Sequence, residues 1–150
     1  MLPSQAAVPP VLRTRSSSKS KSSSFQVSST YSPFASHNIQ LTVSHSGAGT
    51  VTIDGFTVDT FGKLYRSCGN CKQSAERHVV VKSVKASNGK LLVGINSNFG
   101  DTATIDGATC ASSVKEICEE FEGTTPGNEP KSVSTGPSAA CGFTDPVPAC

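Results

Sequence analysis

The sequence of 150 residues contains no tryptophan, a single methionine and only 6% aromatic side chains. A small domain with so little aromatic volume needs other means of holding its core together. No run of about 18 apolar residues occurs, so the sequence predicts no membrane-spanning segment. It also lacks a Gly-x-Ser-x-Gly motif, a phosphate-binding loop and a dinucleotide fingerprint, which removes the usual signatures of hydrolases and nucleotide-binding enzymes.

Acidic residues are missing from the first 53 positions, which hold four basic residues. Four charges among serines do not indicate nucleic-acid binding. The segment 1–36 is rich in Ser and Pro and lacks the apolar stretch of a secretory signal. We predict a disordered leader or propeptide over 1–36, in which Leu12 and Arg15 form a processing site cleaved after Arg15; it resembles the sites that kexin-type proteases cleave in fungal proproteins. An organellar transit peptide and an unprocessed tail are the alternatives.

Cysteine is present in quantity, with six residues in the last 83 positions: Cys68, Cys71, Cys110, Cys118, Cys141 and Cys150. An even number in a small domain predicts disulfides, and therefore a secreted, extracellular protein. A redox site at Cys68 and Cys71 and a zinc site are competing interpretations. No helical periodicity follows Cys71, and the spacing of Cys110 and Cys118 does not suit zinc, so we expect no metal and no cofactor.

Six cysteines allow 15 pairings, and the sequence does not choose among them. We expect Cys68 and Cys71 to bond to separate partners among the later cysteines. The main rival is a local bridge between Cys141 and Cys150. Cys110 should not pair with Cys118, because eight helical residues would place their Cα atoms about 12 Å apart.

From Asn38 onward, Thr, Val and Ile alternate with polar residues, a pattern typical of half-buried strands. Asp54-Gly55 and Asn88-Gly89 each separate two such arms, which predicts two hairpins with type I′ turns. The segments 50–57 and 102–109 share the pattern Thr-x-Thr-Ile-Asp-Gly-x-Thr. A duplicated unit would explain this likeness. Only a few residue types suit a strand followed by a tight turn, however, and we favour this simpler explanation.

One segment has helical rather than alternating periodicity. Thr109 would cap its start and Gly123 would end it. Its apolar residues recur at helical spacing, at Ala111, Val114, Ile117, Cys118 and Phe121. The predicted fold class is α+β, with antiparallel β-hairpins forming a sheet or sandwich, one helix and stabilising disulfides. This β-rich domain spans 37–123, and disulfides tie down a Pro/Gly-rich tail over 124–150.

The leader, the cysteines and the β-rich domain together resemble the small secreted cysteine-rich proteins of filamentous fungi, many of which are effectors in virulence on a plant host. The resemblance implies a monomeric, non-catalytic binding protein whose partner is a host protein or a cell-wall polysaccharide. We place the candidate binding loop at Gly69, Asn70, Lys72 and Glu76 and predict no catalytic residues.

Two other functions remain open. A small secreted ribonuclease or hydrolase could use Glu76, Arg77 and His78, but consecutive residues of a strand alternate faces and cannot all converge on one phosphate. That alternative therefore requires Glu76 to share a cleft with His45 and His78. The other alternative is an organelle-imported thiol or zinc protein.

Overall fold

The computed structural model describes residues 24–27 and 42–150. Leu12 and Arg15 lie outside these residues, so the processing site stays a prediction. Within the described part, no helix is long and apolar enough to cross a membrane. In chain order the elements are β1 (Ser24–Val27), β2 (Val43–His45), β3 (Gly49–Asp54), β4 (Thr57–Ser67), β5 (Arg77–Lys82), β6 (Lys85–Asn96), the 3₁₀ turn η1 (Ser97–Phe99), β7 (Thr102–Ile105), β8 (Cys110–Glu122), β9 (Lys131–Thr135) and β10 (Cys141–Gly142).

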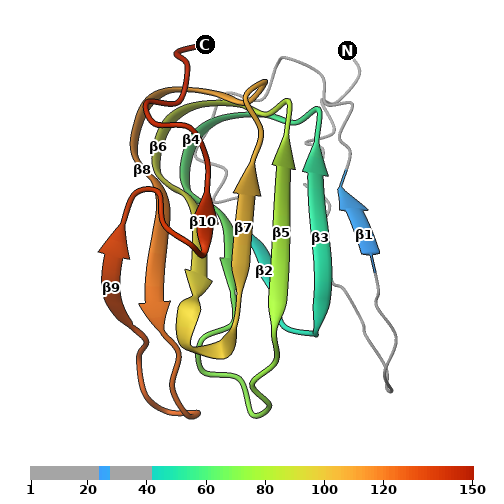
Figure 1. Cartoon of the computed structure of the whole chain (residues 1–150), viewed down its shortest axis with the longest axis vertical. Coiled ribbons are helices and arrows are strands. Elements are labelled where there is room, and N and C mark those ends of the chain that lie inside the picture. The colour runs from blue at the N-terminus through green and yellow to red at the C-terminus, as the bar shows by residue number, and fades with distance from the viewer. Residues whose placement is uncertain (1–23, 28–41) are drawn as a thin grey trace, which may run out of the picture.

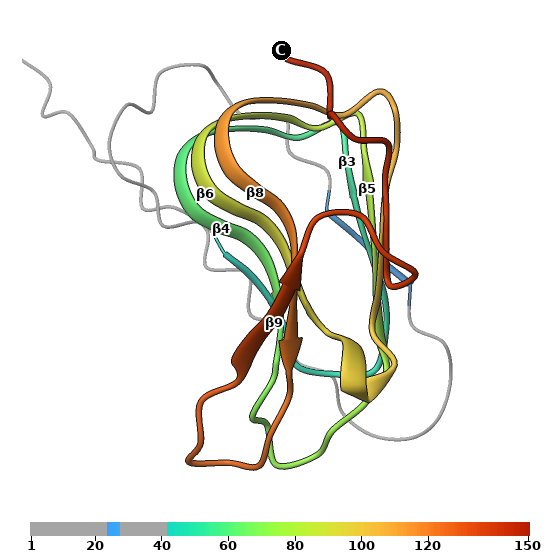
Figure 2. The ribbon, with the colours of Figure 1, turned by 60° about the vertical axis from the view of Figure 1, so that its left-hand side comes forward.

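The strands form a parallel β-solenoid. Sheet A has the order β1-β3-β5-β7-β10 and sheet B the order β2-β4-β6-β8-β9. The chain passes from one sheet to the other with nearly every strand, so each coil stacks on the one before it (Figures 1 and 2). All neighbouring strands are parallel except the antiparallel pair β8 and β9. The predicted α+β fold of antiparallel hairpins is therefore wrong.

Neither predicted hairpin forms. Asp54-Gly55 is the corner between β3 and β4, which belong to different sheets, and Gly55 takes a positive φ of 64° there. Asn88-Gly89 lies within β6, where Asn88 has a φ of 52°. Alternation of apolar and polar residues shows that one face of a strand is buried, but it does not identify the neighbouring strand. Each arm here bonds to the next coil instead of to its sequence neighbour.

Two irregularities in β8, a stacked kink and a break in alternation, explain the false helix. Thr60, Asn88 and Ser113 all have positive φ values, of 53°, 52° and 55°. They occupy the same position in β4, β6 and β8, between residues that pair in register. After the kink at Ser113, Val114 packs against the core, and the adjacent Ile117 and Cys118 both do so as well, which breaks the alternation and leaves Val114 and Ile117 three residues apart. That spacing imitates an α-helix, whereas 110–122 is a strand.

The core lies between the two sheets. Sheet A contributes side chains that are at least 95% buried, including Val51, Ile53, Val79 and Val81, and sheet B contributes others such as Leu64, Leu92 and Ile95. The two similar Thr-rich segments occupy equivalent positions in their coils. Ile53 pairs with Val81 and Val81 with Ile105, so the repeated sequence serves the same corner in the first and third coils.

Three disulfides join Cys68 to Cys71, Cys110 to Cys150 and Cys118 to Cys141. The expectation that Cys68 and Cys71 bond to separate partners is wrong, and so is the rival bridge within the tail. Cys68 and Cys71 close a short loop after β4. The other two disulfides fasten the C-terminal segment to β8 at two points.

Candidate functional site

Two basic side chains and an aromatic ring meet on the outer face of sheet B. We call the group of Lys63, Arg66, Gly94 and Phe121 the basic face. The guanidinium carbon of Arg66 lies 3.9 Å from the centroid of the Phe121 ring, and the Lys63 amine lies 5.8 Å from it. Cations within about 6 Å of a ring face are attracted by its quadrupole, so the ring holds both positive charges at the surface.

Gly94 provides the space in which this group assembles. Arg66 on β4 pairs in register with Gly94 on β6, which pairs with Glu119 on β8. A Cβ atom on Gly94 would lie 2.9 Å from Cδ of Arg66 and 3.2 Å from the Phe121 ring. A side chain at this position would therefore force Arg66, and with it the contact between the guanidinium and the ring, to shift.

Arg66 is half-buried and held from one side. Its Nη1 donates to the Ser67 carbonyl oxygen at 2.8 Å and to Oδ1 of Asn96 at 3.1 Å. Desolvation lowers the pKa of Arg66, while the carboxylates of Asp101 and Glu119 oppose that shift. The guanidinium stays charged, because arginine does not lose its proton in proteins.

Charges on this side of sheet B are arranged by strand. Lys63 and Arg66 lie on β4, whereas Glu116 and Glu119 lie at the matching register positions of β8. An anionic ligand would therefore be attracted to the β4 side and repelled from the β8 side. Among the described residues, no group of three or more His, Cys, Asp or Glu side chains is placed to hold a metal ion.

The first half of the predicted binding loop, Gly69 and Asn70, packs against the segment 124–130. A Cβ atom on Gly69 would lie 2.4 Å from Cγ of Pro130, and Nδ2 of Asn70 donates to the Asn128 carbonyl oxygen at 2.9 Å. Lys72 is exposed. The loop leans on the segment 124–130, so the structure does not bring its four candidate residues into one surface.

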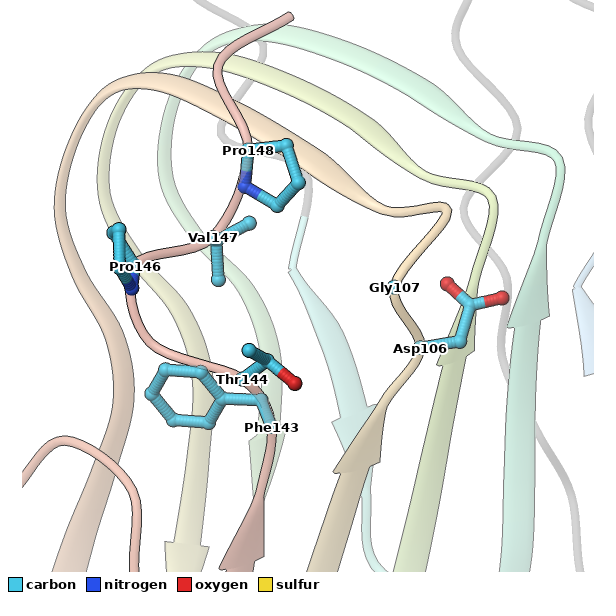
Figure 3. A pocket seen from close by; sticks show the side chains of 7 residues that line it. All are labelled: Asp106, Gly107, Phe143, Thr144, Pro146, Val147 and Pro148. Atoms are coloured by element: carbon cyan, nitrogen blue, oxygen red, sulfur yellow. The ribbon is translucent and has the colours of Figure 1, made fainter.

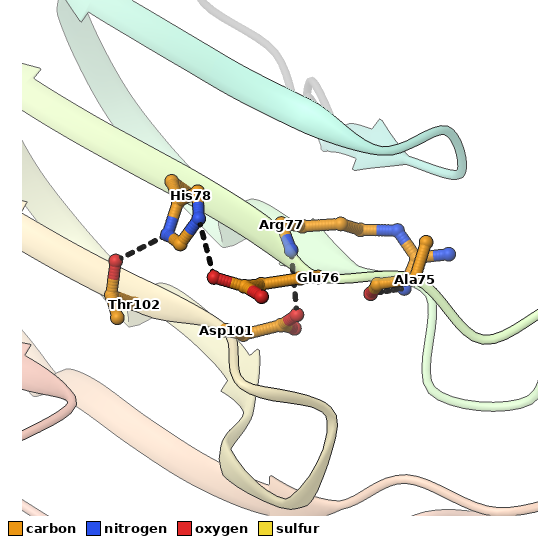
Figure 4. Close-up of polar contacts among 6 residues, drawn as sticks. All are labelled: Ala75, Glu76, Arg77, His78, Asp101 and Thr102. Atoms are coloured by element: carbon orange, nitrogen blue, oxygen red, sulfur yellow. Dashed lines mark hydrogen bonds and ion pairs between the residues drawn. The ribbon is translucent and has the colours of Figure 1, made fainter. Parts of the chain in front are cut away.

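Glu76 lies apart from the rest of that loop. It pairs with His78 on the outer face of sheet A, with 3.0 Å between Oε1 and Nε2, and Nδ1 of His78 lies 2.6 Å from the Thr102 hydroxyl (Figure 4). Arg77 is buried and donates to the carbonyl oxygens of Ser46, Gly47, Cys68 and Ala75. The trio Glu76, Arg77 and His78 is thus split between two faces, as strand alternation predicts.

His45 does not join Glu76 and His78. Its Nδ1 lies 2.7 Å from the Tyr65 hydroxyl, and burial lowers the pKa of this imidazole, with Arg77 adding to the effect. Burial raises the pKa of Tyr65, which therefore keeps its proton. The three groups that the ribonuclease alternative requires do not form one constellation.

A shallow cavity of about 190 Å³ lies beneath the C-terminal segment. It is lined mainly by Phe143, Pro146, Val147 and Pro148, together with the Asp106-Gly107 corner (Figure 3). The Asp106 side chain points away from these apolar groups, and its Oδ1 accepts hydrogen bonds from Ser83 and Thr109. The cavity thus offers apolar walls and no reactive side chain.

Sequence reasoning missed Lys63, Arg66 and Phe121. Lys63 and Arg66 flank the apolar pair Leu64-Tyr65, a break in alternation that marks a bend in the strand and places both cations on one side. The predicted helix places Phe121 on its buried side. Only the parallel stacking of β4 and β8 on either side of β6 brings the ring to the cations.

Comparisons with known proteins agree with one another. A family model described as pectate lyase matches residues 16–128. The chain is 60% identical over 109 residues to pectate lyase H of Emericella nidulans and 56% identical over 108 residues to a probable pectate lyase D of Neosartorya fischeri; each match covers 72% of this chain. The chain spans less than half of these relatives, 42% and 45% of their lengths. The crystal structure of a pectate lyase from Pectobacterium carotovorum superposes with a TM-score of 0.55 at 26% identity, over 69% of this chain and 35% of that one.

These findings correct the functional expectations drawn from the sequence. The resemblance to effector-type proteins, and with it the non-catalytic virulence role, is wrong. The ribonuclease and organellar alternatives fail as well, and all six cysteines are in disulfides. The secreted, extracellular location is confirmed. The solenoid fold, the matched residues and the relatives lead to one conclusion: this chain belongs to the pectate lyase family.

Proposed function

We propose that this chain binds pectate on the basic face and cleaves it by elimination. Pectate is a polymer of galacturonate and carries one carboxylate per sugar. The observation that supports this function is the placement of Lys63 and Arg66 around the Phe121 ring, which puts two cations on one side of sheet B. The relatives named above are pectate lyases, which favours this anionic polymer over other polyanions.

The geometry suits a carboxylate. Both hydrogen bonds of the Arg66 guanidinium come from Nη1, so within the described residues its Nε and Nη2 protons remain for a ligand. Two parallel N–H donors match the two oxygens of a carboxylate. The ring of Phe121 can support the apolar face of a sugar, and Lys63 reaches the carboxylate of the same or a neighbouring sugar as a mobile point charge.

Elimination removes the proton on C5, next to the carboxylate. The electron pair of that C–H bond forms the C4–C5 double bond, and the bond from C4 to the glycosidic oxygen breaks; that oxygen then takes a proton from solvent. Negative charge builds up on the carboxylate during this step, and Arg66 stabilises it. Lys63 accepts the C5 proton after its ammonium group has released a proton to solvent, since Arg66 cannot release one and Phe121 has no ionisable group.

The test is the product. The chain is incubated with polygalacturonate, and the absorbance of the double bond conjugated to the carboxylate is followed, with a neutral galactan as control. We expect unsaturated product from polygalacturonate alone. Lys63→Arg should retain binding but lose turnover, because it keeps the charge and removes the base. New reducing ends without unsaturation, or no cleavage at all, would contradict the proposal.

A further inference from the structure

We infer that Asn96 is a positioning residue for Arg66. The inference rests on the proposed function, because Arg66 is the group that we place against the substrate carboxylate. Asn96 ends β6, is fully buried, and lies behind the basic face. Its side chain contacts Arg66 on one side and a buried acidic group on the other.

The hydrogen-bond partners determine which way the Asn96 amide points. Its Nδ2 donates to Oγ of Ser67 at 2.7 Å and lies 3.3 Å from Oδ2 of Asp101. Both of these neighbours can accept a hydrogen bond, and the Ser67 hydroxyl in turn donates to Asp101. With the NH₂ group directed at these acceptors, Oδ1 must face the other way, where it accepts from Nη1 of Arg66 at 3.1 Å.

Asp101 anchors the chain of hydrogen bonds. Its side chain is 99% buried and accepts from the backbone N–H groups of Arg77 at 3.0 Å and Asn96 at 2.9 Å. Backbone donors of two strands therefore fix the carboxylate in place. Each bond in such a series polarises the next, so the acid strengthens the acceptor that Asn96 offers to Arg66.

A positioning role follows from the different exposure of the two ends of this series of hydrogen bonds, Asp101 and Arg66. Asp101, Ser67 and Asn96 are all buried, whereas Arg66 reaches the surface. Asn96 contacts Nη1 and no other nitrogen of the guanidinium, and together with the Ser67 carbonyl oxygen it fixes the rotation of the group and turns its Nε and Nη2 side outward. Without Asn96, the Ser67 carbonyl oxygen alone would hold Nη1, and a single acceptor leaves the guanidinium free to rotate over the Phe121 ring, so that it would no longer present a fixed pair of donors.

The first measurement needs no substrate. The ¹⁵N–¹H spectrum of the guanidinium groups is recorded for the parent, Asn96→Ala and Ser67→Ala, with Arg66 assigned from Arg66→Lys. Thr109→Val is the matched control, because Thr109 is also fully buried and hydrogen-bonded, but at the corner before β8. We expect the Nη protons of Arg66 to be resolved in the parent and the control, and averaged in Asn96→Ala. If Asn96→Ala does not fold, Ser67→Ala replaces it, and we expect the Nη protons of Arg66 to be averaged in that variant too.

The second measurement is the affinity for a short galacturonate oligomer, by calorimetry. Asn96→Ala should weaken binding about 10-fold in the parent and have no further effect when Arg66 is already alanine. Unchanged Arg66 resonances in both variants would overturn the inference, as would an equal loss of affinity with and without Arg66. Averaged resonances in a protein that binds no oligomer would instead leave the positioning role intact and overturn the proposed function.

Discussion

The outer faces of the two sheets differ in how their polar groups are satisfied. On sheet A, both nitrogens of His78 are engaged by protein groups, Thr102 on one side and Glu76 on the other. On sheet B, Arg66 is held through one nitrogen and rests on an aromatic ring, and Lys63 approaches the same ring. On sheet A the side chains of Glu76, His78 and Thr102 thus satisfy one another, whereas on sheet B Arg66 keeps hydrogen-bond donors available for a ligand. Glu76 and His78, whose residue types look catalytic in the sequence, lie on sheet A and away from the basic face.

Removing a charge from each face gives the largest expected contrast. Arg66→Ala should reduce cleavage of polygalacturonate by about 100-fold or more, since it removes the charge that stabilises the developing anion. Lys82→Ala is the control, because Lys82 is an exposed cation at the end of β5 on the outer face of sheet A. It should change the rate by less than about 2-fold. Equal losses in kcat/KM for the two variants would mean that general attraction of the polymer, rather than the basic face, governs the reaction.

Adding one methyl group beneath the basic face should have a smaller effect. Gly94→Ala places a Cβ atom 2.9 Å from Arg66 Cδ and 3.2 Å from Phe121, so the Arg66 side chain must shift and we expect its contact with the ring to weaken. We expect about a 10-fold lower kcat/KM with Arg66 still present. Gly107→Ala serves as the control, because no atom lies within 4 Å of its added methyl group. Steady-state kinetics on polygalacturonate measure both, and an unchanged rate in Gly94→Ala would show that the contact with the ring is dispensable.

The sequence predicts the strands of this fold better than their arrangement. Alternation identifies the buried residues of β3, such as Val51 and Ile53, and the turn at Asp54-Gly55 lies where a turn was expected. The same alternation fits parallel and antiparallel partners, so the solenoid could not be read from it. In β8, the adjacent core residues Ile117 and Cys118 break the period of two, and together with Val114 they give a spacing that resembles a helix.

The candidate site could not be predicted from the sequence for a related reason. Arg66 and Phe121 are 55 positions apart and meet because β4 and β8 lie on either side of β6, over a glycine. No local pattern in the sequence indicates which residue lies two strands away. The cysteines did predict the extracellular location, because that inference depends on redox chemistry and not on topology.

His45 on sheet B provides a test of stability rather than of activity. Burial lowers the pKa of His45 in the folded protein below its value of about 6.5 in the unfolded chain. The unfolded state therefore binds more protons as the pH falls below that value, and the folded protein loses stability there. Urea unfolding should give a lower free energy at about pH 5.5 than at about pH 7.5, and His45→Gln should flatten this slope. A slope that persists unchanged in His45→Gln would assign it to other groups.

Breaking the polar pairs on sheet A should have the smallest effect of all. The His78 and Glu76 side chains are 34% and 64% exposed, and exposed ion pairs contribute less than about 1 kcal/mol. His78→Gln and Thr102→Val should therefore each change the free energy of unfolding by less than about 1 kcal/mol and leave kcat/KM within about 2-fold of the parent. A loss of turnover in either variant comparable with that of Arg66→Ala would remove the distinction between the faces. It would place a carboxylate, an imidazole and a hydroxyl in the reaction, and the outer face of sheet A would then be the second place at which the polymer binds.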